Sequence, residues 1–134
     1  MRIVGGEFGG TVLNAPKGRT TRPTGERTRE ALFSVLASQA DFSLTQARVL
    51  DLFAGTGALG LEALSRGGEF CLFVENDTRV RGTLRDNCEA CGVLGRTKIY
   101  RRDATRLGPR AATAGPVFNL VFADPPYGKQ LAEA

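Results

Sequence analysis

The sequence predicts an α/β fold in which helices pack against a parallel β-sheet. Apolar runs typical of buried strands alternate with stretches of helical periodicity. A glycine-rich turn joins the first sheet strand to a helix, and the 134 residues are enough to form one hydrophobic core. Such alternation gives right-handed crossovers, and a doubly wound strand order of 3-2-1-4 would set the first and fourth strands side by side.

A β-hairpin and a helix are predicted ahead of the sheet. β-Prone runs at 2–4 and 11–13 flank a glycine-rich tip that we expect to be flexible. A basic loop at 14–23 follows. Thr24 is the predicted N-cap of a helix over about 25–38, because apolar residues recur there at helical spacing.

The sheet domain is predicted to cover residues 47–134, after an N-terminal extension of residues 1–46. The apolar runs that mark its strands are residues 49–53, 70–75, 97–101 and 117–123. Helical patterns lie between the strands. They cover the stretch from the glycine-rich turn to Gly67, residues 78–91 and a short piece within 106–115.

A glycine pattern, Gly55, Gly57 and Gly60, lies at the carboxyl end of the first strand. Doubly wound sheets bind cofactors at this place, because glycines let a ligand approach the backbone. The pattern alone also fits a dinucleotide site or a tight turn without a ligand. Asp51 lies just before the turn, where its carboxylate would repel a pyrophosphate and attract an ammonium group. The stretch therefore favours S-adenosylmethionine, whose methionine part carries an ammonium group.

An acid at the end of the second strand supports a ligand that contains a nucleoside. Glu75 follows Gly55 by about twenty residues, the spacing at which an acid binds ribose hydroxyls in such folds. We therefore expect Glu75 to contact the ribose.

The stretch Asp124-Pro125-Pro126-Tyr127 comes directly after the fourth strand. Prolines stiffen the backbone and leave its carbonyl oxygens as acceptors. The Asp124 carboxylate and the Pro125 carbonyl can accept both hydrogens of an exocyclic amino group, while Tyr127 can stack on the base. These contacts would aim the nitrogen lone pair at a sulfonium methyl group, so that positioning supplies most of the catalysis. A proline-stiffened turn without catalytic function is the alternative interpretation.

Composition narrows the possible chemistry. The chain contains no histidine, which excludes histidine triads, histidine general bases and histidine zinc sites. Its three cysteines, Cys71, Cys88 and Cys91, are an odd set. The last two fall in a helical pattern, where packing is favoured over a metal site. The chain has no apolar N-terminal run and no long apolar span. We therefore expect a cytoplasmic protein that binds neither a metal nor a membrane.

Positive charge concentrates ahead of the sheet domain. The cations of this stretch are Lys17, Arg19, Arg22, Arg27 and Arg29, against the single acid Glu26. A local cationic patch suits the phosphates of RNA or DNA. A solvated basic loop is the alternative interpretation.

The motifs together resemble a known family. DLFAGTGALGLEALSRG, FVEND, Arg102-Asp103-Ala104 and FADPPYGK are similar to class I S-adenosylmethionine-dependent amino methyltransferases. The resemblance becomes more specific with two N-terminal stretches, MRIVGG and RPTGERTREALFSVL, which are similar to the bacterial 16S rRNA guanine-N2 methyltransferase D family. The resemblance to this family covers nearly the whole chain. This resemblance implies a Rossmann-like class I methyltransferase sheet. It also implies methyl transfer to N2 of a guanine in 16S rRNA, in the small ribosomal subunit or its assembly intermediate.

The resemblance also implies roles for individual residues. The methionine part would lie against Asp51 and the loop that contains Phe53, Gly55, Thr56 and Gly57. Glu75 would bind the ribose, with Asn76 or Asp77 near the adenine, and Asp103-Ala104 would contact the adenine amino group. The guanine would lie against Asp124, Pro125, Pro126 and Tyr127. RNA would contact the hairpin and Lys17, Arg19, Arg22, Arg27 and Arg29.

Two features depart from the family pattern. The hairpin tip reads Phe8-Gly9-Gly10-Thr11, where relatives usually carry basic residues. The chain ends seven residues after Tyr127, whereas the family fold continues. We therefore expect a fragment whose fourth strand is an exposed sheet edge, open to self-association.

Other functions fit parts of this pattern. A DNA adenine-N6 methyltransferase is one alternative, because the Asp124–Tyr127 motif serves any exocyclic amine. A non-catalytic RNA-binding module of the same fold is a second. A nicotinamide oxidoreductase is disfavoured by Asp51 and the paired prolines.

Overall fold

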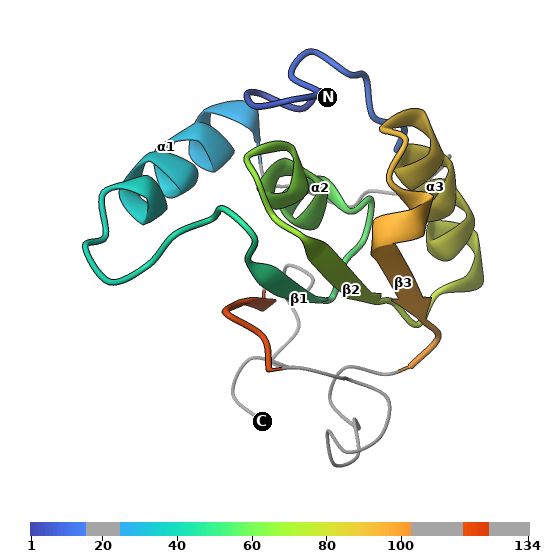
Figure 1. The fold of residues 1–134 in the computed structure, drawn as a ribbon. Helices are drawn as coiled ribbons and strands as arrows, with labels where there is room; N and C mark the ends of the chain where they lie inside the picture. Colours follow the sequence, from blue (N-terminus) through green and yellow to red (C-terminus); the bar gives the residue numbers. More distant parts are fainter. Residues whose placement is uncertain (16–24, 103–116, 124–134) are drawn as a thin grey trace.

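Four parallel strands form the sheet at the centre of the molecule (Figure 1). The computed structural model describes residues 1–15, 25–102 and 117–123. The strands are β1 (Arg48–Leu52), β2 (Phe70–Val74), β3 (Thr97–Tyr100) and β4 (Leu120–Ala123), in the order β3-β2-β1-β4. Leu50 of β1 lies opposite Leu72 on one side and Val121 on the other. The predicted fold class and strand order are confirmed.

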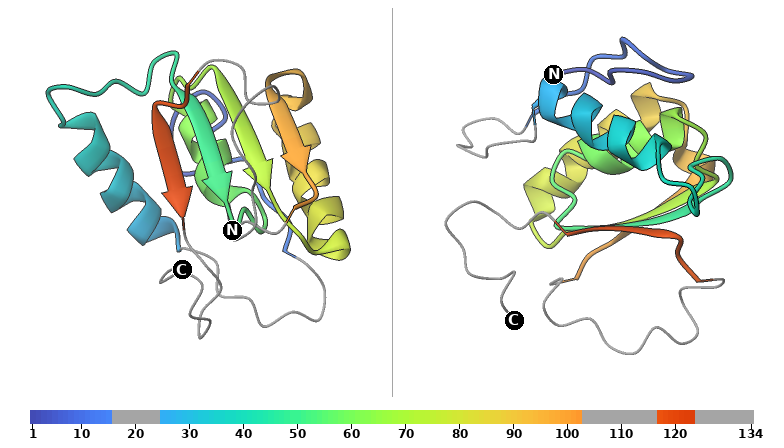
Figure 2. Two further views of the ribbon diagram at one scale, coloured as in Figure 1. Left: turned by 90° about the horizontal axis from the view of Figure 1, so that it is seen from below. Right: turned by 90° about the vertical axis from the view of Figure 1, so that its left-hand side faces the viewer.

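The three α-helices of the described residues lie on one face of this sheet, as the edge-on view in Figure 2 shows. They are α1 (Glu26–Ala37), α2 (Ala58–Ser65) and α3 (Thr78–Ala90), and a short 3₁₀ helix, η1 (Leu94–Arg96), leads into β3. α2 packs over β1 and β2, and α3 packs over β3. α1 covers β4, where the Phe33 and Phe122 ring centroids are 5.7 Å apart. None of the described helices is long and apolar enough to cross a bilayer.

The hydrophobic core lies between the helices and the sheet. Val49, Leu61, Phe73 and Leu84 are fully buried there. Gly60 lets α2 approach the sheet closely, because a Cβ at this position would lie 2.5 Å from the Phe73 ring. The third glycine of the motif is therefore a packing residue between helix and strand.

The N-terminal segment joins the same core. Arg2 and Val12 form an isolated antiparallel bridge, and Ile3 and Leu13 point inward with 1% and 4% of their surface exposed. This agrees with the predicted hairpin, although the pairing is too short to form a strand. The tip is held against α2, in contrast to the flexible tip that its glycines predict. The Glu7 N–H donates to the Ser65 carbonyl at 2.7 Å, at the end of α2.

Element boundaries differ slightly from the prediction. α1 begins at Glu26 with Gly25 at the N-cap position, so Thr24, which lies outside the described residues, is not its cap. The fourth strand begins at Leu120, because the Asn119 side chain accepts from the Arg48 N–H at 2.8 Å in place of a ladder carbonyl. β4 is an edge of the described sheet. The helix expected within 106–115 lies outside the described residues.

Candidate cofactor site

The candidate site lies where β1 and β2 end. Residues 53–57 leave β1 and turn into α2, and the Ala54 N–H donates to the Val74 carbonyl at 3.0 Å, which holds the turn against the end of β2. The next residue, Glu75, is bound to the neighbouring strand through its N–H, which donates to the Tyr100 carbonyl at 3.0 Å. The loops after three strands therefore meet at one edge of the sheet.

Glu75 holds the glycine loop through its side chain. One carboxylate oxygen accepts from the Gly55 N–H at 2.8 Å, and the other accepts from the Asp77 N–H at 3.1 Å. These two bonds fix the direction of the carboxylate, and the residue as a whole is half-buried. The structure thus brings together two predicted site residues that are 20 positions apart in the chain.

The three motif glycines have different surroundings. Gly55 has φ +58°, and among the described residues a Cβ there would meet nothing closer than the Phe53 carbonyl at 4.0 Å. Gly57 has φ +85°, and its Cβ would lie 2.4 Å from a methyl group of Leu84. Gly60 faces the Phe73 ring, as described above. Gly55 is therefore the glycine of this motif that borders open space, and a ligand could approach the backbone there.

Phe53 has an unusual backbone conformation. Its φ of 54° lies in the left-handed region, which bulky side chains rarely adopt. Such strain costs about 1–3 kcal/mol and is found mostly at functional sites. The strained residue opens the same loop that contains Gly55, which supports a functional role for the loop.

Asp51 supports the loop from inside the protein. It is 1% exposed, and its Oδ2 accepts from the Gly60 N–H at 3.1 Å, in the first turn of α2. A carboxylate is stabilised near a helix N-terminus, where unpaired N–H groups and the helix dipole attract negative charge. Asp51 is therefore placed to anchor the start of α2 against β1, and its contact with the methionine part of the cofactor stays a prediction.

Asn87 is a site-supporting residue that was not predicted from the sequence. Its side chain is fully buried and donates to the Thr56 carbonyl at 2.9 Å, within the glycine loop. The same amide accepts from the Asn14 N–H at 2.8 Å and donates to the Asn14 carbonyl at 3.0 Å. Asn87 therefore connects the loop with the end of the hairpin. An asparagine on the apolar face of α3, beside Leu84 and Cys88, was the signal that could have revealed it.

Asn76 and Asp77 lie between β2 and α3. Asn76 is exposed, and its carbonyl accepts from the Arg81 guanidinium at 2.7 Å. The Asp77 side chain caps α3 and accepts from the Arg79 N–H at 2.9 Å. Of the two, Asn76 is the one with a side chain directed to solvent beside Glu75.

Arg29 requires a correction, because it does not face RNA. Its side chain is completely buried and donates to Glu62 at 2.7 Å and to the Arg2 carbonyl at 2.7 Å. The sequence shows only a cation near the start of a helix, whereas the fold turns this face of α1 toward α2. Arg27 is exposed on the same helix, as the prediction requires.

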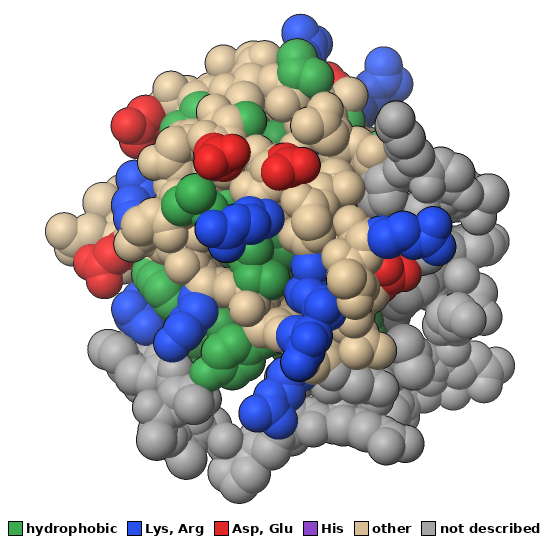
Figure 3. Space-filling view, turned by 90° about the vertical axis from the view of Figure 1, so that its right-hand side faces the viewer, with side chains coloured by type: hydrophobic (Ala, Val, Ile, Leu, Met, Phe, Trp, Pro, Cys, Tyr) green, Lys and Arg blue, Asp and Glu red, His purple; other side chains and the backbone are tan. Residues whose placement is uncertain are grey.

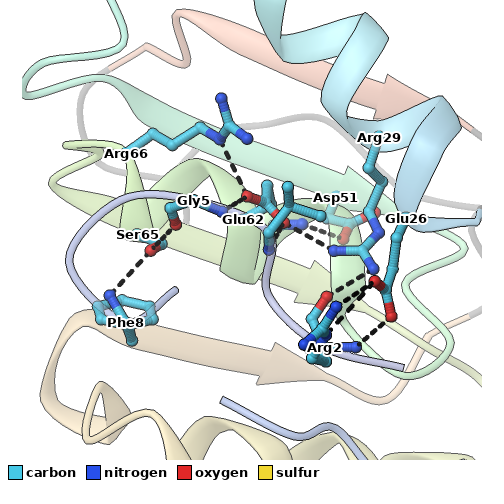
Figure 4. A network of polar contacts seen from close by, with 11 residues as sticks. Arg2, Gly5, Phe8, Glu26, Arg29, Asp51, Glu62, Ser65 and Arg66 are labelled. Carbon is cyan, nitrogen blue, oxygen red and sulfur yellow. Dashed lines mark hydrogen bonds and ion pairs between the residues drawn. The ribbon is translucent and has the colours of Figure 1, made fainter. Parts of the chain in front are cut away.

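Glu62 is the acceptor at the centre of a buried polar network (Figure 4). Oε1 accepts from Arg29 and from the Val4 N–H at 2.9 Å, and Oε2 accepts from the Gly5 N–H and from Arg66, each at 2.9 Å. The network joins the hairpin, α1 and α2. Glu62 had no predicted role, because its partners on the hairpin and α1 are distant in the chain.

Other predicted site residues lie outside the described residues. They are Lys17, Arg19, Arg22, Asp103, Ala104, Asp124, Pro125, Pro126 and Tyr127. Their proposed roles stay predictions.

The cysteines are placed for packing. Burial raises the pKa of the Cys71 thiol well above its ordinary value, and the Asp51 charge raises it further. Burial also raises the pKa of Cys88 to about 12. Both thiols are therefore protonated at neutral pH, which disfavours nucleophilic attack and metal binding. Within the described ranges, no group of three or more metal-ligating side chains is close enough to hold an ion.

Comparison with known proteins identifies the family. The model of the family described as Conserved hypothetical protein 95 matches residues 1–134. The chain is 39% identical to YlbH of Bacillus subtilis (strain 168) over 100% of its own length and 71% of that protein. It is 38% identical to Ribosomal RNA small subunit methyltransferase D of Escherichia coli (strain K12), over 99% of the chain and 63% of the relative.

Solved structures agree with this assignment. A hypothetical protein of Thermus thermophilus superposes with a TM-score of 0.82 at 34% identity, over 99% of this chain and 73% of that one. The chain thus spans 63–73% of the length of these relatives. The predicted resemblance is confirmed, and the chain belongs to the Conserved hypothetical protein 95 family, which includes Ribosomal RNA small subunit methyltransferase D.

Proposed function

We propose that this protein uses S-adenosylmethionine to methylate the exocyclic N2 amine of a guanine in 16S rRNA of the small ribosomal subunit. The family supports rRNA methylation as the reaction class, because a relative with 38% identity is named Ribosomal RNA small subunit methyltransferase D. The guanine N2 position rests on the resemblance described above and on the Asp124–Tyr127 motif.

The contact between Glu75 and Gly55 carries the proposal. It places a fixed carboxylate, on a half-buried residue, beside a glycine whose Cβ position would face open space among the described residues. A ribose needs such an acceptor for its hydroxyl groups, and the sulfur end of the ligand needs close approach to the backbone. The carboxylate acceptor and the accessible backbone on the described side of the site therefore support a ligand that contains a nucleoside. S-Adenosylmethionine supplies the electrophilic methyl group when it is bound.

The residues of this chain would then bind and orient. Glu75 accepts from the ribose hydroxyls, and Asn76 and Asp103 lie toward the adenine in the proposed arrangement. Asp124 and the Pro125 carbonyl accept the two amino hydrogens of guanine, and Tyr127 stacks on the base. No strong base is required, because the amino proton becomes acidic only as the methyl group is transferred. The Asp124 carboxylate would be an acceptor for that proton.

The N-terminal residues 1–46 are proposed as an RNA-binding extension of the sheet domain 47–134. Arg27 is exposed on α1, and Lys17, Arg19 and Arg22 precede it in the chain. Their positive charge suits a phosphate backbone. The hairpin is held against α2 by Glu62 and Ser65, so RNA bound to the extension would lie in a defined position relative to the sheet.

The test is methyl transfer from radiolabelled S-adenosylmethionine to undermethylated small ribosomal subunits, followed by identification of the methylated nucleoside. N2-methylguanosine is the expected product. Asp124→Ala should abolish transfer and leave cofactor affinity nearly unchanged, as measured by calorimetry. N6-methyladenosine, or transfer only to DNA, would overturn the proposal. Cofactor binding without any transfer would favour the non-catalytic module.

A further inference from the structure

Positive charge gathers on the face formed by α3 and β3, which Figure 3 views directly. Between Arg79 and Arg102 the chain carries seven cations against two acids, Asp86 and Glu89, which leaves a net charge of +5. This exceeds the charge of the basic stretch before the sheet. The net charge of the whole sheet domain does not reveal this cluster, because acids elsewhere in the domain nearly cancel its positive charge.

Five of the seven cations are available to a partner. Arg81 donates to the Asn76 carbonyl at 2.7 Å, and Arg96 donates to the Gly68 carbonyl at 3.2 Å, so both are used inside the protein. The exposed cations are Arg79, Arg85, Lys98, Arg101 and Arg102. Within the described part of the chain, no acid lies within 4.0 Å of any of these five.

The exposed cations lie on α3, on β3 (the edge strand next to β2) and directly after β3. Arg85 lines a shallow hollow with Thr97 and Ile99, which places it beside β3. Arg79 is in the first turn of α3, close after Glu75. Arg101 and Arg102 follow Tyr100, whose carbonyl accepts from the Glu75 N–H at 3.0 Å. Arg79, Arg101 and Arg102 therefore follow the carboxyl ends of β2 and β3, where the loops of the candidate site also lie.

We propose that this α3–β3 face, defined by Arg79, Arg85, Lys98, Arg101 and Arg102, binds the phosphate backbone of the RNA substrate. The inference rests on the proposed function, because it assigns a docking surface to the same reaction. Arginine guanidinium groups bind phosphate with two parallel hydrogen bonds, and several exposed cations on one side of the molecule attract the phosphates of a nucleic acid strand. The burial of Arg29 makes this second surface more important, since it removes one cation from the N-terminal stretch.

A triple variant tests the proposal. Arg85→Gln, Lys98→Gln and Arg101→Gln together remove three positive charges from exposed positions. The control, Val117→Glu with Asn119→Asp and Val121→Glu, makes the same net change of three charges at exposed positions in and just before β4, outside both proposed RNA surfaces. The probe is a fluorescein-labelled RNA hairpin, and fluorescence anisotropy gives Kd over a series of salt concentrations. Calorimetry with S-adenosylmethionine checks that each variant keeps its folded site.

The triple variant should bind the hairpin about tenfold more weakly at low salt, and the slope of log K against log salt should shrink by about two. The control should keep the wild-type slope. Equal slopes for wild type and triple variant would overturn the inference, as would an equal loss in the control or no binding of RNA by the wild type.

Failure of the proposed function is separately visible. If wild type binds cofactor and RNA but transfers no methyl group to ribosomal subunits, the proposed reaction is wrong. The comparison of RNA-binding slopes still decides whether this face holds RNA.

Discussion

The two ends of α2 are both polar, but they differ in how their polar groups are used. At its C-terminal half, the Glu62 carboxylate is fully buried and receives four protein donors. Before its N-terminus, the glycine loop is held by the carboxylate of Glu75, a half-buried residue, while Gly55 borders open space among the described residues. One end has no capacity left for a ligand, and the other has donors and acceptors fixed in place but still accessible.

This comparison distinguishes a structural polar cluster from a candidate binding site at the two ends of one helix. A buried charge is tolerated when its partners satisfy it completely, and removing one partner then costs stability. A partly satisfied carboxylate at a sheet edge costs little to the fold and can exchange water for a ligand. Substitutions at the two ends should therefore affect different measurements.

The largest expected effect is on stability, at Glu62. Glu62→Gln removes a fully buried negative charge that accepts from two arginines and two hairpin N–H groups, so the free energy of unfolding should fall by about 3–5 kcal/mol. Denaturant titration measures it. The matched control is Glu69→Gln, whose side chain is 56% exposed and 4.0 Å from Arg48, and it should lose at most about 1 kcal/mol. Equal losses in the two variants would contradict the distinction between the two ends.

The second effect is on ligand binding, at Glu75. Glu75→Ala removes the acceptor that fixes Gly55 and the proposed ribose contact, so the affinity for S-adenosylmethionine should fall by about 1–3 kcal/mol. Calorimetry measures the affinity, and thermal unfolding should show a smaller change than in Glu62→Gln. Unchanged affinity would remove Glu75 from the cofactor site.

Asn87 should affect both measurements, because it connects the loop with the hairpin. Asn87→Ala leaves the buried Thr56 carbonyl without its donor, which should cost about 1–3 kcal/mol of stability. Cofactor affinity should also decrease, although Asn87 itself does not border the open space. Asp86→Ala, at the exposed neighbouring position, is the control and should change neither quantity. A loss of stability without any loss of affinity would show that Asn87 does not position the loop.

The smallest effect is the pH dependence that arises from Cys88. Burial raises its folded-state pKa to about 12, above the ordinary value of 9.0. The stabilising contribution of the protonated thiol is therefore complete below pH 9 and is lost as the pH rises toward 12. Denaturant titrations of wild type and Cys88→Ala from pH 8 to 10.5 should diverge above pH 9, with wild type losing more stability. Parallel curves would mean that the thiol titrates normally.

Much of the architecture followed from local patterns. Apolar runs, helical spacing and glycine positions depend on residues close in the chain, so they predicted β1 to β4 and the loop around Gly55 correctly. The strand order also followed, because right-handed crossovers leave few topologies. The spacing from Gly55 to Glu75 could be read in the sequence, since a helix and a second strand separate them by a nearly constant length.

Tertiary structure decided which charges face water. Arg29 and Glu62 are 33 positions apart, and nothing local in either stretch distinguishes a buried ion pair from two solvated side chains. The same holds for Asn87, whose partners lie on two separate loops, and for the cations of α3 and β3, which converge only when the sheet forms. Backbone pattern is a local property of the chain, whereas desolvation and charge pairing depend on long-range packing, which is known only from the folded protein.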